Sequence, residues 1–440
     1  MADARAAAAA SFPLRAYGAV AGLALPVLKL LHASRVRAGK EDPARRGERF
    51  GVASLPRPQG RLVWLHAASV GETNSVLPLI ERLTGEGASV LLTTVTRTSA
   101  EIAAQRLPQG AFHQYAPFDA PQLVRRFLAH WQPDLALVVE SEIWPGTFAR
   151  LARTGIPLAI INGRMSARSG AKWEKSRAFG RAVFGCVSLC LAQSEADAAR
   201  YRKLGVADVR SPGNLKFDAA APQADPATVA ALSAQMAGRP LWLAASTHPG
   251  EDEIVLAAHK HLAERFPGLL TLLMPRHPVR GGDIAALAAG AGLKAAQRSC
   301  GAFPAADLDV YIADTLGEMG LFLRLAPAVF LGGSFAPVGG HNPVEPAQLN
   351  VPLVTGPLVA NARAVYRDLW DAQAAVRVDD QAELGSAIAR LLADEPGRKA
   401  MAARAFAVAE AGAGALDRTL EHLRPLLYAD SGARDGISGE

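Results

Sequence analysis

The feature that most constrains the fold is an alternation of short apolar runs with helical stretches. Strands that alternate with helices form βαβ units, in which the strands pair in parallel and helices cover both faces of the sheet. The first half of the chain therefore predicts a parallel α/β sheet. Its apolar runs, each typical of a buried strand, cover 62–66, 90–94, 135–139, 158–162 and 187–192.

The same alternation restarts after a linker at 211–218 that contains proline and glycine. A single core rarely serves 440 residues, and a pattern that begins again indicates a second domain. We therefore predict two similar α/β domains, at 51–212 and 213–428, with an N-terminal segment at 1–50 and a polar, disordered tail at 429–440. The apolar runs of the second half cover 241–245, 269–274, 310–313, 328–331 and 352–354.

The N-terminal segment contains an apolar stretch, Tyr17–Leu31, that precedes a basic one. The stretch is shorter than the roughly 20 residues that cross a bilayer, and it contains Pro26 and Lys29. We expect a helix in the membrane interface, with cations directed toward anionic head groups. A true membrane span and a buried core helix remain alternatives, and residues 1–10 are expected to be disordered or frayed. The cations are Arg35, Arg37, Lys40, Arg45, Arg46 and Arg49.

Composition excludes several classes of function. The 47 basic and 41 acidic residues give a net charge of +6, and no basic stripe is interleaved with aromatic residues, so a nucleic-acid partner is not predicted. The cysteines Cys186, Cys190 and Cys300 are read as reduced thiols of a cytoplasmic protein. Because no histidine, cysteine or carboxylate set has the spacing of metal ligands, neither a metal nor a cofactor is predicted.

Polar residues follow the predicted strands of the first half. Ligands of parallel sheets bind beyond the carboxyl ends of the strands, so these positions are the first candidates for a site. Ser69, Gly71 and Glu72 follow the first strand, where Glu72 opens the next helix. This carboxylate could cap the helix, or it could act as a general base that takes a proton from an acceptor hydroxyl.

Two further strand ends carry charge. Glu140 and Glu142 follow the third strand, and they would point to opposite sides if the strand continued, so at most one would face a cleft. Arg164 follows the fourth strand, where it is either a ligand-binding residue or a solvated surface arginine.

A glycine-rich loop follows the run at 328–331. Gly332, Gly333, Gly339 and Gly340 lie between this strand and the expected start of a helix at Pro343. The arrangement predicts a place where backbone N–H groups face an anion. It lacks the glycine spacing of a dinucleotide fingerprint and the lysine of a P-loop, so neither of those sites is predicted.

The other strand ends of the second half also carry polar groups suited to an anionic ligand. Arg276 would pair with a phosphate or a carboxylate, and Glu318 or Glu345 could accept from ribose hydroxyls. The full set of residues that are candidates for binding this anionic ligand is Ser246, Thr247, His248, Arg276, His277, Gly317, Glu318, Gly340, His341, Asn342, Glu345 and Asn361.

These motifs, taken in order, resemble those of the 3-deoxy-D-manno-octulosonic acid (Kdo) transferases over nearly the whole chain. Each is weak alone, and their order is the specific signal. They are the N-terminal apolar stretch, Glu48-Arg-Phe-Gly51, His66-Ala-Ala-Ser-Val-Gly-Glu72, Glu140-Ser-Glu-Ile-Trp-Pro145, Asn162-Gly-Arg164, Gly213-Asn-Leu-Lys-Phe-Asp218, Ala245-Ser-Thr-His248, Pro275-Arg-His-Pro278, Asp314-Thr-Leu-Gly-Glu318, Gly332-Gly-Ser-Phe335, Gly340-His-Asn342 and Glu345-Pro346.

The resemblance implies a GT-B fold, in which two Rossmann-like parallel-sheet domains face each other across a cleft. It implies transfer of Kdo from CMP-Kdo to a lipid A precursor (lipid IVA) at the cytoplasmic face of the inner membrane. Glu72 would then be the catalytic base of an inverting, metal-independent reaction. Ser69, Gly71, Glu142 and Arg164 would bind the acceptor, while the second domain would bind the donor.

One position departs from the family pattern. Family members usually carry Gly-Pro-His after the last strand of the donor domain, whereas this chain has Leu358 in place of the histidine, with Asn361 nearby. Two alternatives stay open. The chain could be another GT-B enzyme that uses a UDP-sugar, such as a lipid A disaccharide synthase or an epimerase. It could also be a membrane-surface protein that senses a nucleotide without turning it over.

Overall fold

The computed structural model describes residues 2–236 and 238–428, which form two compact units. The first unit runs to Ala219 and resumes at Ala413, and the second comprises Ala220–Gly412. The helix α20 (Ala415–Leu427) therefore belongs to the first unit, although the sequence placed it in the second. The predicted tail at 429–440 lies outside the described residues.

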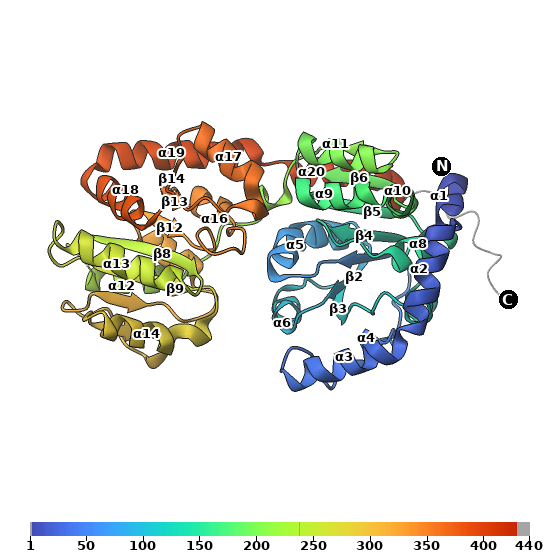
Figure 1. Cartoon of the computed structure of the whole chain (residues 1–440), viewed down its shortest axis with the longest axis horizontal. Helices are drawn as coiled ribbons and strands as arrows, with labels where there is room; N and C mark the ends of the chain where they lie inside the picture. The colour runs from blue at the N-terminus through green and yellow to red at the C-terminus, as the bar shows by residue number, and fades with distance from the viewer. Residues whose placement is uncertain (1, 237, 429–440) are drawn as a thin grey trace. The chain divides into compact units, whose positions relative to one another are not determined.

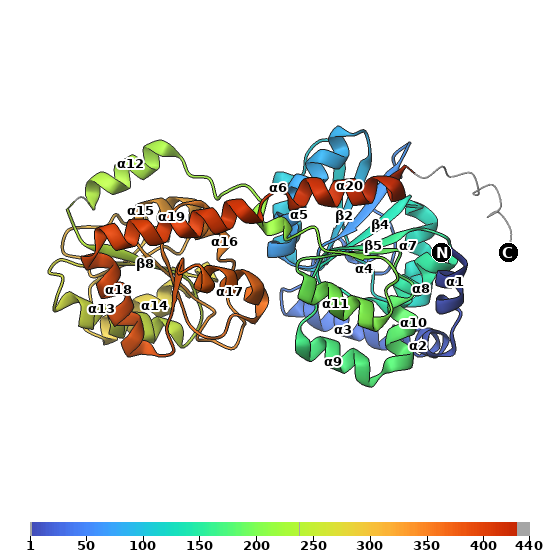
Figure 2. The same cartoon turned by 90° about the horizontal axis from the view of Figure 1, so that it is seen from above.

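Helix α20 joins the first unit because its apolar face completes that unit's core. Leu420, Leu423 and Leu427 are buried in the same cluster as Leu65 and Leu137 of the central strands. Figure 2 shows α20 running beside α5. The sequence pattern identified a helix here but could not show which sheet its apolar face would cover.

The first unit is a sheet of seven strands in the order β3-β2-β1-β4-β5-β6-β7, with every neighbouring pair parallel (Figure 1). The five predicted strands are present, and the sequence analysis missed the two outermost, β3 and β7. The strands are β1 (Leu62–His66), β2 (Ser89–Thr94), β3 (Ala111–Tyr115), β4 (Leu135–Val139), β5 (Leu158–Gly163), β6 (Leu189–Ala192) and β7 (Val209–Arg210).

Helices cover both faces of this sheet, and the order of the strands reverses beside β1. After β3 the chain returns to the other side of β1 to form β4, which creates a crevice at the carboxyl ends of β1 and β4. The helices are α5 (Val70–Gly85), α6 (Arg97–Arg106), α7 (Pro121–Trp131), α8 (Pro145–Arg153), α9 (Ala167–Lys175), α10 (Arg177–Phe184) and α11 (Glu195–Leu204).

The second unit has the same design. Its seven parallel strands follow the order β10-β11-β9-β8-β12-β13-β14, and the order reverses between β8 and β12. The sequence again missed two short strands, β10 and β14. The strands are β8 (Leu241–Thr247), β9 (Leu270–Pro275), β10 (Ala295–Gln297), β11 (Val310–Ile312), β12 (Val329–Leu331), β13 (Leu353–Thr355) and β14 (Ala375–Arg377).

In sequence, α12 precedes the first strand of the second unit, α13 to α17 lie between its strands, and α18 and α19 follow the last one. Helix α12 packs beside α15, and α19 packs on α16. The helices of the second unit are α12 (Pro226–Gln235), α13 (Glu251–Ala263), α14 (Gly281–Gly290), α15 (Met319–Leu325), α16 (Val344–Gln348), α17 (Arg363–Asp371), α18 (Gln381–Ala393) and α19 (Glu395–Gly412).

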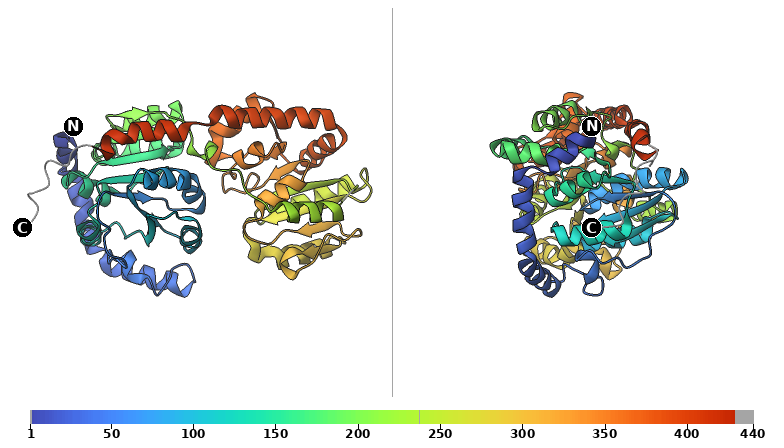
Figure 3. Two further views of the ribbon diagram at one scale, coloured as in Figure 1. Left: turned by 180° about the vertical axis from the view of Figure 1, so that it is seen from behind. Right: turned by 90° about the vertical axis from the view of Figure 1, so that its right-hand side faces the viewer.

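The N-terminal segment is helical from its start. The helices α1 (Ala2–Ala9), α2 (Phe12–Leu23) and α3 (Leu25–Arg37) follow one another along the side of the first unit (Figure 3). Ala9 and Leu14 are buried against the unit, where α1 packs on α8 and α10. The expectation that residues 1–10 are disordered or frayed is therefore wrong for residues 2–10, because the alanine-rich helix α1 packs on α8 and α10. Residue 1 lies outside the described residues.

The apolar stretch forms two helices that bend by 58° at their junction. Among the described residues no single helix is long and apolar enough to cross a membrane, although α2 and α3 together pass that test of length and composition. Their outward side chains form an exposed apolar face, hereafter the apolar face of α2 and α3: Phe12, Val20, Leu23, Val27, Leu30 and Leu31.

Some cations of the basic stretch form ion pairs within the first unit instead of pointing toward a membrane surface. Arg49 is buried, pairs with Glu41 and lies over the ring of Phe118. Arg35 also pairs with Glu41, and Arg45 pairs with Glu48 (2.8 Å each). The expectation that all six cations point outward is wrong for these three, because ion pairs with the buried Glu41 and Glu48 hold them against the unit.

Candidate active site

The site of the first unit lies in the crevice between β1 and β4. Ser69 precedes α5 and caps it, accepting a hydrogen bond from the backbone N–H of Glu72. The Glu72 carboxylate in turn accepts from the backbone N–H of Ala68 (2.8 Å) and from the Ser69 hydroxyl (3.0 Å). Glu72 is thus both part of a helix cap and a carboxylate at the ligand-binding edge of the sheet.

The environment of Glu72 disfavours its charge. Burial, and next the negative charge of Glu140, raise its pKa from 4.5 to about 7, against the opposing hydrogen bonds from Ala68 and Ser69. A carboxylate that titrates near neutral pH can both accept and release a proton under physiological conditions, which is what a general base requires. The sequence prediction that Glu72 could serve as a base is consistent with this geometry.

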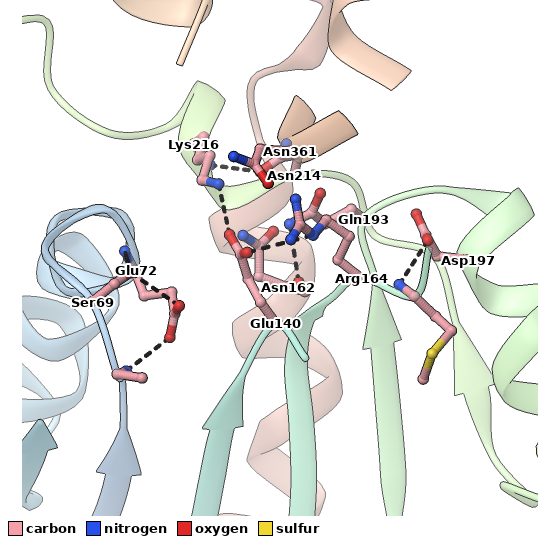
Figure 4. A network of polar contacts seen from close by, with 12 residues as sticks. Ser69, Glu72, Glu140, Asn162, Arg164, Gln193, Asp197, Asn214, Lys216 and Asn361 are labelled. Carbon is pink, nitrogen blue, oxygen red and sulfur yellow. Dashed lines mark hydrogen bonds and ion pairs between the residues drawn. The ribbon is translucent and has the colours of Figure 1, made fainter. Parts of the chain in front are cut away.

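Glu140 occupies the centre of a charged cluster that the sequence did not anticipate. Its carboxylate forms ion pairs with Lys216 (2.6 Å) and Arg164 (3.8 Å), and Figure 4 shows these side chains together beyond the strand ends. Tyr201 donates its hydroxyl to the backbone carbonyl oxygens of Glu140 and Arg164. Arg164 is therefore held in the site and is not a freely solvated surface arginine.

The expectation that at most one of Glu140 and Glu142 faces the crevice agrees with the cavity lining, which includes Glu142 but not the buried Glu140. The reason given for it does not hold, because strand β4 ends at Val139 and Glu140 turns the chain with a φ of 55°. The charge of each carboxylate nevertheless raises the pKa of Glu72. A non-glycine residue in this left-handed conformation costs energy and is found most often where a fold positions functional groups.

Glu142 differs from Glu72 in its electrostatics. The imidazole of His66, 3.9 Å from the carboxylate, and the indole N–H of Trp144 (2.9 Å) lower the pKa of Glu142. His66 is oriented by Thr93 through its other nitrogen. The site thus combines a carboxylate that stays ionised with one, Glu72, that titrates near neutrality.

A cavity of about 540 Å³ in the first unit adjoins these carboxylates. Its lining includes the carboxylates Glu142 and Asp119, the buried Arg49, and Trp144. Most of the other lining residues are apolar, with Phe118 among them. A cavity of this size, with two carboxylates and mainly apolar walls, suits a ligand with hydroxyl and hydrocarbon parts.

Gly71 lies in the first turn of α5, where a Cβ atom would meet no other atom within 4 Å. The packing of the unit therefore does not require a glycine at this position. The open space leaves room for close approach of a ligand, and the acceptor-binding role of Gly71 stays a prediction.

In the second unit, three histidines and an arginine gather at the carboxyl ends of the strands. Nε2 of His248, after β8, lies 2.9 Å from Nε2 of His341, after β12, and their rings stack 5.1 Å apart. The ring of His277, after β9, stands 6.0 Å from that of His248. The strand order thus assembles three residues that the sequence had placed on separate strands.

This histidine cluster, which comprises His248, His277, His341 and Arg276, is uncharged apart from the arginine at neutral pH. Burial, and then the positive charge of Arg276, lower the pKa of His341 to about 3. Burial also lowers the pKa of His248 and His277. Arg276 is exposed. A guanidinium surrounded by imidazole N–H donors is a suitable arrangement for a phosphate.

The glycine-rich loop binds the carboxylate of Glu251, a side chain of its own unit, instead of the anionic ligand that was expected. Its backbone N–H groups, from Gly333 to Ala336, donate to the carboxylate of Glu251, which also accepts from the N–H of His248. Glu251 is 1% exposed. The expectation that these N–H groups face an external ligand is wrong, because a side chain of the same unit occupies them.

Glu251 and His341 explain two of the glycines. A Cβ at Gly332 would lie 2.9 Å from the Glu251 carboxylate, and one at Gly333 would lie 2.9 Å from the His341 ring. Gly333 also has a φ of +67°. The loop is therefore closed around an internal carboxylate, and this closure holds His341 beside His248.

Several residues that were predicted to bind the donor form hydrogen bonds or turns within the second unit. Thr247 is buried and donates to Asp252 (2.7 Å), and Ser246 turns the chain with a φ of 57°. Asn361 donates to the carbonyl oxygens of Val338 (2.7 Å) and Gly340 (3.2 Å), so its amide fastens the glycine-rich loop.

The other predicted donor residues lie nearer the surface. Asn342 donates to Glu345 (3.4 Å) at the start of α16. Gly317 has a φ of 82° and open space where a Cβ would be. Leu358, at the position where the family pattern has histidine, is 42% exposed.

No site role was predicted for Lys216, His66, Trp144 or Glu251. Glu251 belongs to none of the motifs and has its main partners far away in the sequence, so only the fold shows it. Lys216, His66 and Trp144 belong to motifs that carry the family resemblance, and this membership was the available signal.

Two parallel-sheet units, each with polar residues at the reversal of its strand order, are the building blocks of the GT-B fold. Comparison with solved structures agrees on the fold. The chain is similar to a glycosyltransferase from Rickettsia africae (TM-score 0.59, 11% identity, covering 84% of this chain and 100% of that one). It is equally similar to Staphylococcus aureus MnaA in complex with UDP (TM-score 0.59, 14% identity, covering 84% and 97%).

Sequence comparison identifies the family. Residues 44–219 match the family model described as 3-deoxy-D-manno-octulosonic-acid transferase (kdotransferase). The Kdo transferase of Haemophilus influenzae is 35% identical over 384 residues, which cover 86% of this chain and 90% of the relative. That of Bordetella pertussis is 38% identical over 393 residues, covering 86% and 91%. The chain belongs to the Kdo transferase family.

Proposed function

We propose that this protein transfers Kdo from CMP-Kdo to a lipid A precursor (lipid IVA) in lipopolysaccharide core biosynthesis. The observation that carries the proposal is the Glu72 carboxylate, whose pKa is raised to about 7 beside Glu140 and Glu142. Membership of the family supplies the donor and acceptor classes. The donor binds the second unit and the acceptor binds the first.

The reaction is an inverting displacement. Glu72 takes the proton of an acceptor hydroxyl, whose oxygen bonds to the anomeric carbon of Kdo as the bond from that carbon to the CMP phosphate oxygen breaks. CMP leaves with the electron pair, and Arg276 with the histidine cluster stabilises the negative charge that develops on it. Because the leaving group is a phosphate monoester, we propose that the protein's own cations serve and that no metal is needed.

We propose that the acceptor sugar occupies the cavity beside Glu142 and Trp144. An indole ring packs against the apolar face of a sugar, and a carboxylate accepts its hydroxyls. Arg164 and Ser69 lie at the same strand ends and would contact the acceptor near the reacting hydroxyl. Gly71 leaves open space beside them.

The apolar face of α2 and α3 supports a membrane surface as the place where the protein encounters its lipid acceptor. Leu23, Phe12 and Leu30 are 83%, 81% and 72% exposed, and the cations Lys29, Arg37 and Lys40 are exposed near them. An exposed apolar face flanked by cations favours insertion at the surface of an anionic membrane. We propose that the protein acts at the cytoplasmic face of the inner membrane, where a lipid acceptor is presented.

A transfer assay tests the function. Purified protein is incubated with freshly made CMP-Kdo, a tetraacyl lipid A precursor and EDTA, and the products are analysed by mass spectrometry. A gain of one or more Kdo masses is expected, and the series of masses counts the transfers. An unchanged acceptor with intact CMP-Kdo, together with consumption of a UDP-sugar, would overturn the proposal. Binding without any turnover would instead indicate a nucleotide sensor.

A further inference from the structure

A second cavity, of about 480 Å³, lies in the second unit beyond the carboxyl ends of β10 and β11. We infer that it is the base pocket of the nucleotide donor and that Glu318 and Arg298 select cytosine in it. The inference rests on the proposed function, since it names the part of CMP-Kdo that this cavity takes. The residues that line it and carry the argument are Arg298, Phe303, Thr315, Leu316 and Glu318.

The walls of the cavity suit a flat aromatic ligand better than a sugar. Phe303 and Leu316 line it and are 62% and 73% exposed, so both present apolar surface to a ligand in the cavity. A pyrimidine ring between them would cover both, and base stacking on such side chains is a general mode of nucleotide recognition. Glu318 or Glu345 was expected to accept from ribose hydroxyls, and for Glu318 these apolar walls favour the base instead.

The polar groups in the cavity match one edge of cytosine. The Glu318 carboxylate accepts two hydrogen bonds from Arg298 and one from Thr315. Burial alone would raise the pKa of Glu318, but these hydrogen bonds lower it, so the carboxylate is ionised at neutral pH. A carboxylate has about four acceptor positions and a guanidinium has five N–H groups, so both retain capacity for a ligand.

Cytosine presents a donor at N4 and acceptors at N3 and O2. The carboxylate can accept from the N4 amino group while the guanidinium donates to N3 or O2. Uracil presents an acceptor at O4 in place of the amino group, and it carries a proton on N3. A uracil in the same orientation would set O4 against the Glu318 carboxylate, so the pair discriminates between these bases.

The strand order places this cavity within reach of the phosphate site. Along the edge of the sheet, β11 is followed by β9, β8 and β12. Arg276 and His277 follow β9, His248 follows β8 and His341 follows β12. Since neighbouring strands lie about 4.8 Å apart, β8 is roughly 10 Å from β11. A nucleotide along this edge would place its base in the cavity and its phosphate at the histidine cluster.

Binding of free nucleotides to the full-length protein tests the inference. Affinities for CMP, UMP, GMP and ribose 5-phosphate are measured by isothermal titration calorimetry. The wild type should bind CMP roughly 10- to 100-fold more tightly than UMP or GMP. In Glu318→Gln this preference should largely disappear, because the amide can donate to O4 of uracil, while the affinity for ribose 5-phosphate should not change.

Two further variants separate recognition from folding. Leu316→Ala, at an exposed position, should weaken CMP and UMP alike and leave ribose 5-phosphate unchanged. Asp307→Asn removes the exposed Lys294–Asp307 pair (3.0 Å) of the same unit and should change none of the affinities.

Three outcomes would overturn the inference. A wild type that binds CMP, UMP and GMP equally would exclude base selection. A Glu318→Gln variant in which ribose 5-phosphate binding falls as much as CMP binding would indicate a ribose pocket. Tighter binding of GMP than of CMP would indicate another donor. Transfer from CMP-Kdo with no base preference would refute this inference alone, whereas failure of CMP to bind together with failure of transfer would refute the proposed function.

Discussion

Replacing Glu72 by glutamine should stabilise the first unit at alkaline pH. In the folded protein burial and the charge of Glu140 raise the pKa of Glu72 to about 7, compared with the ordinary value of 4.5. The difference of about 2.5 units corresponds to roughly 3 kcal/mol, since each unit is worth about 1.4 kcal/mol. That free energy is the upper limit of what the ionised carboxylate costs the folded state.

The sign follows from where the proton is held. Between pH 4.5 and about 7 the folded chain retains a proton on Glu72 that the unfolded chain releases, so the free energy of unfolding falls as the pH rises through this window. Glutamine has no charge to bury and keeps an oxygen that can accept from the Ala68 N–H. The variant should therefore match the wild type at the acid end and exceed it by up to about 3 kcal/mol above the window.

Calorimetric unfolding at two pH values measures this difference. For a unit of this size about 1 kcal/mol shifts Tm by about 2–4 °C, so the variant should melt roughly 6–12 °C higher at alkaline pH and at nearly the same temperature near the acid end. Glu81→Gln, an exposed position on the same helix α5, is the matched control and should show no such pH dependence. A stability difference that is the same at both pH values would refute the reasoning.

Three further predictions concern other parts of the structure. Glu140→Gln should lower the pKa of Glu72, because it removes the charge that opposes ionisation, and should move the acid limb of the pH–rate profile to lower pH; an unmoved limb would contradict this. Glu251→Gln should destabilise the second unit by about 2–3 kcal/mol and raise the KM for the donor, as measured by denaturant unfolding and kinetics, because backbone N–H groups lose a charged acceptor. Leu23→Glu should reduce cosedimentation with anionic vesicles roughly tenfold, whereas Val279→Glu, at an exposed valine of the second unit, should not; equal effects would argue against a membrane face.

Most of the fold could be predicted because the central strands of parallel sheets are continuous apolar runs. The strands that escaped prediction lie at or next to sheet edges, where burial no longer requires such runs. Strand β3 contains His113 and Gln114, and β7 has only two residues. The position of α20 was also missed, since an amphipathic pattern reveals that a face is buried but does not identify its partner.

The candidate site was predictable where one local motif supplies both the side chain and its position. Glu72 follows this rule, because a strand end and a helix start fix it within a few residues. Glu251 does not, since its partners come from a loop more than 80 residues later in the chain. The ion pairs of Glu140 were also missed, because its partners Arg164 and Lys216 follow other strands and its left-handed φ is not visible in the local sequence pattern.

The most direct test of the central claim compares transfer and donor binding in Glu72→Gln. Single-turnover transfer of Kdo from CMP-Kdo to the lipid A precursor is measured by mass spectrometry, and CMP binding is measured on the same preparation. Loss of a positioned general base typically costs about 10²- to 10⁴-fold in rate, so transfer should fall by that amount while CMP affinity stays at the wild-type value. Near-normal transfer by a variant that binds CMP normally would show that Glu72 is not the base.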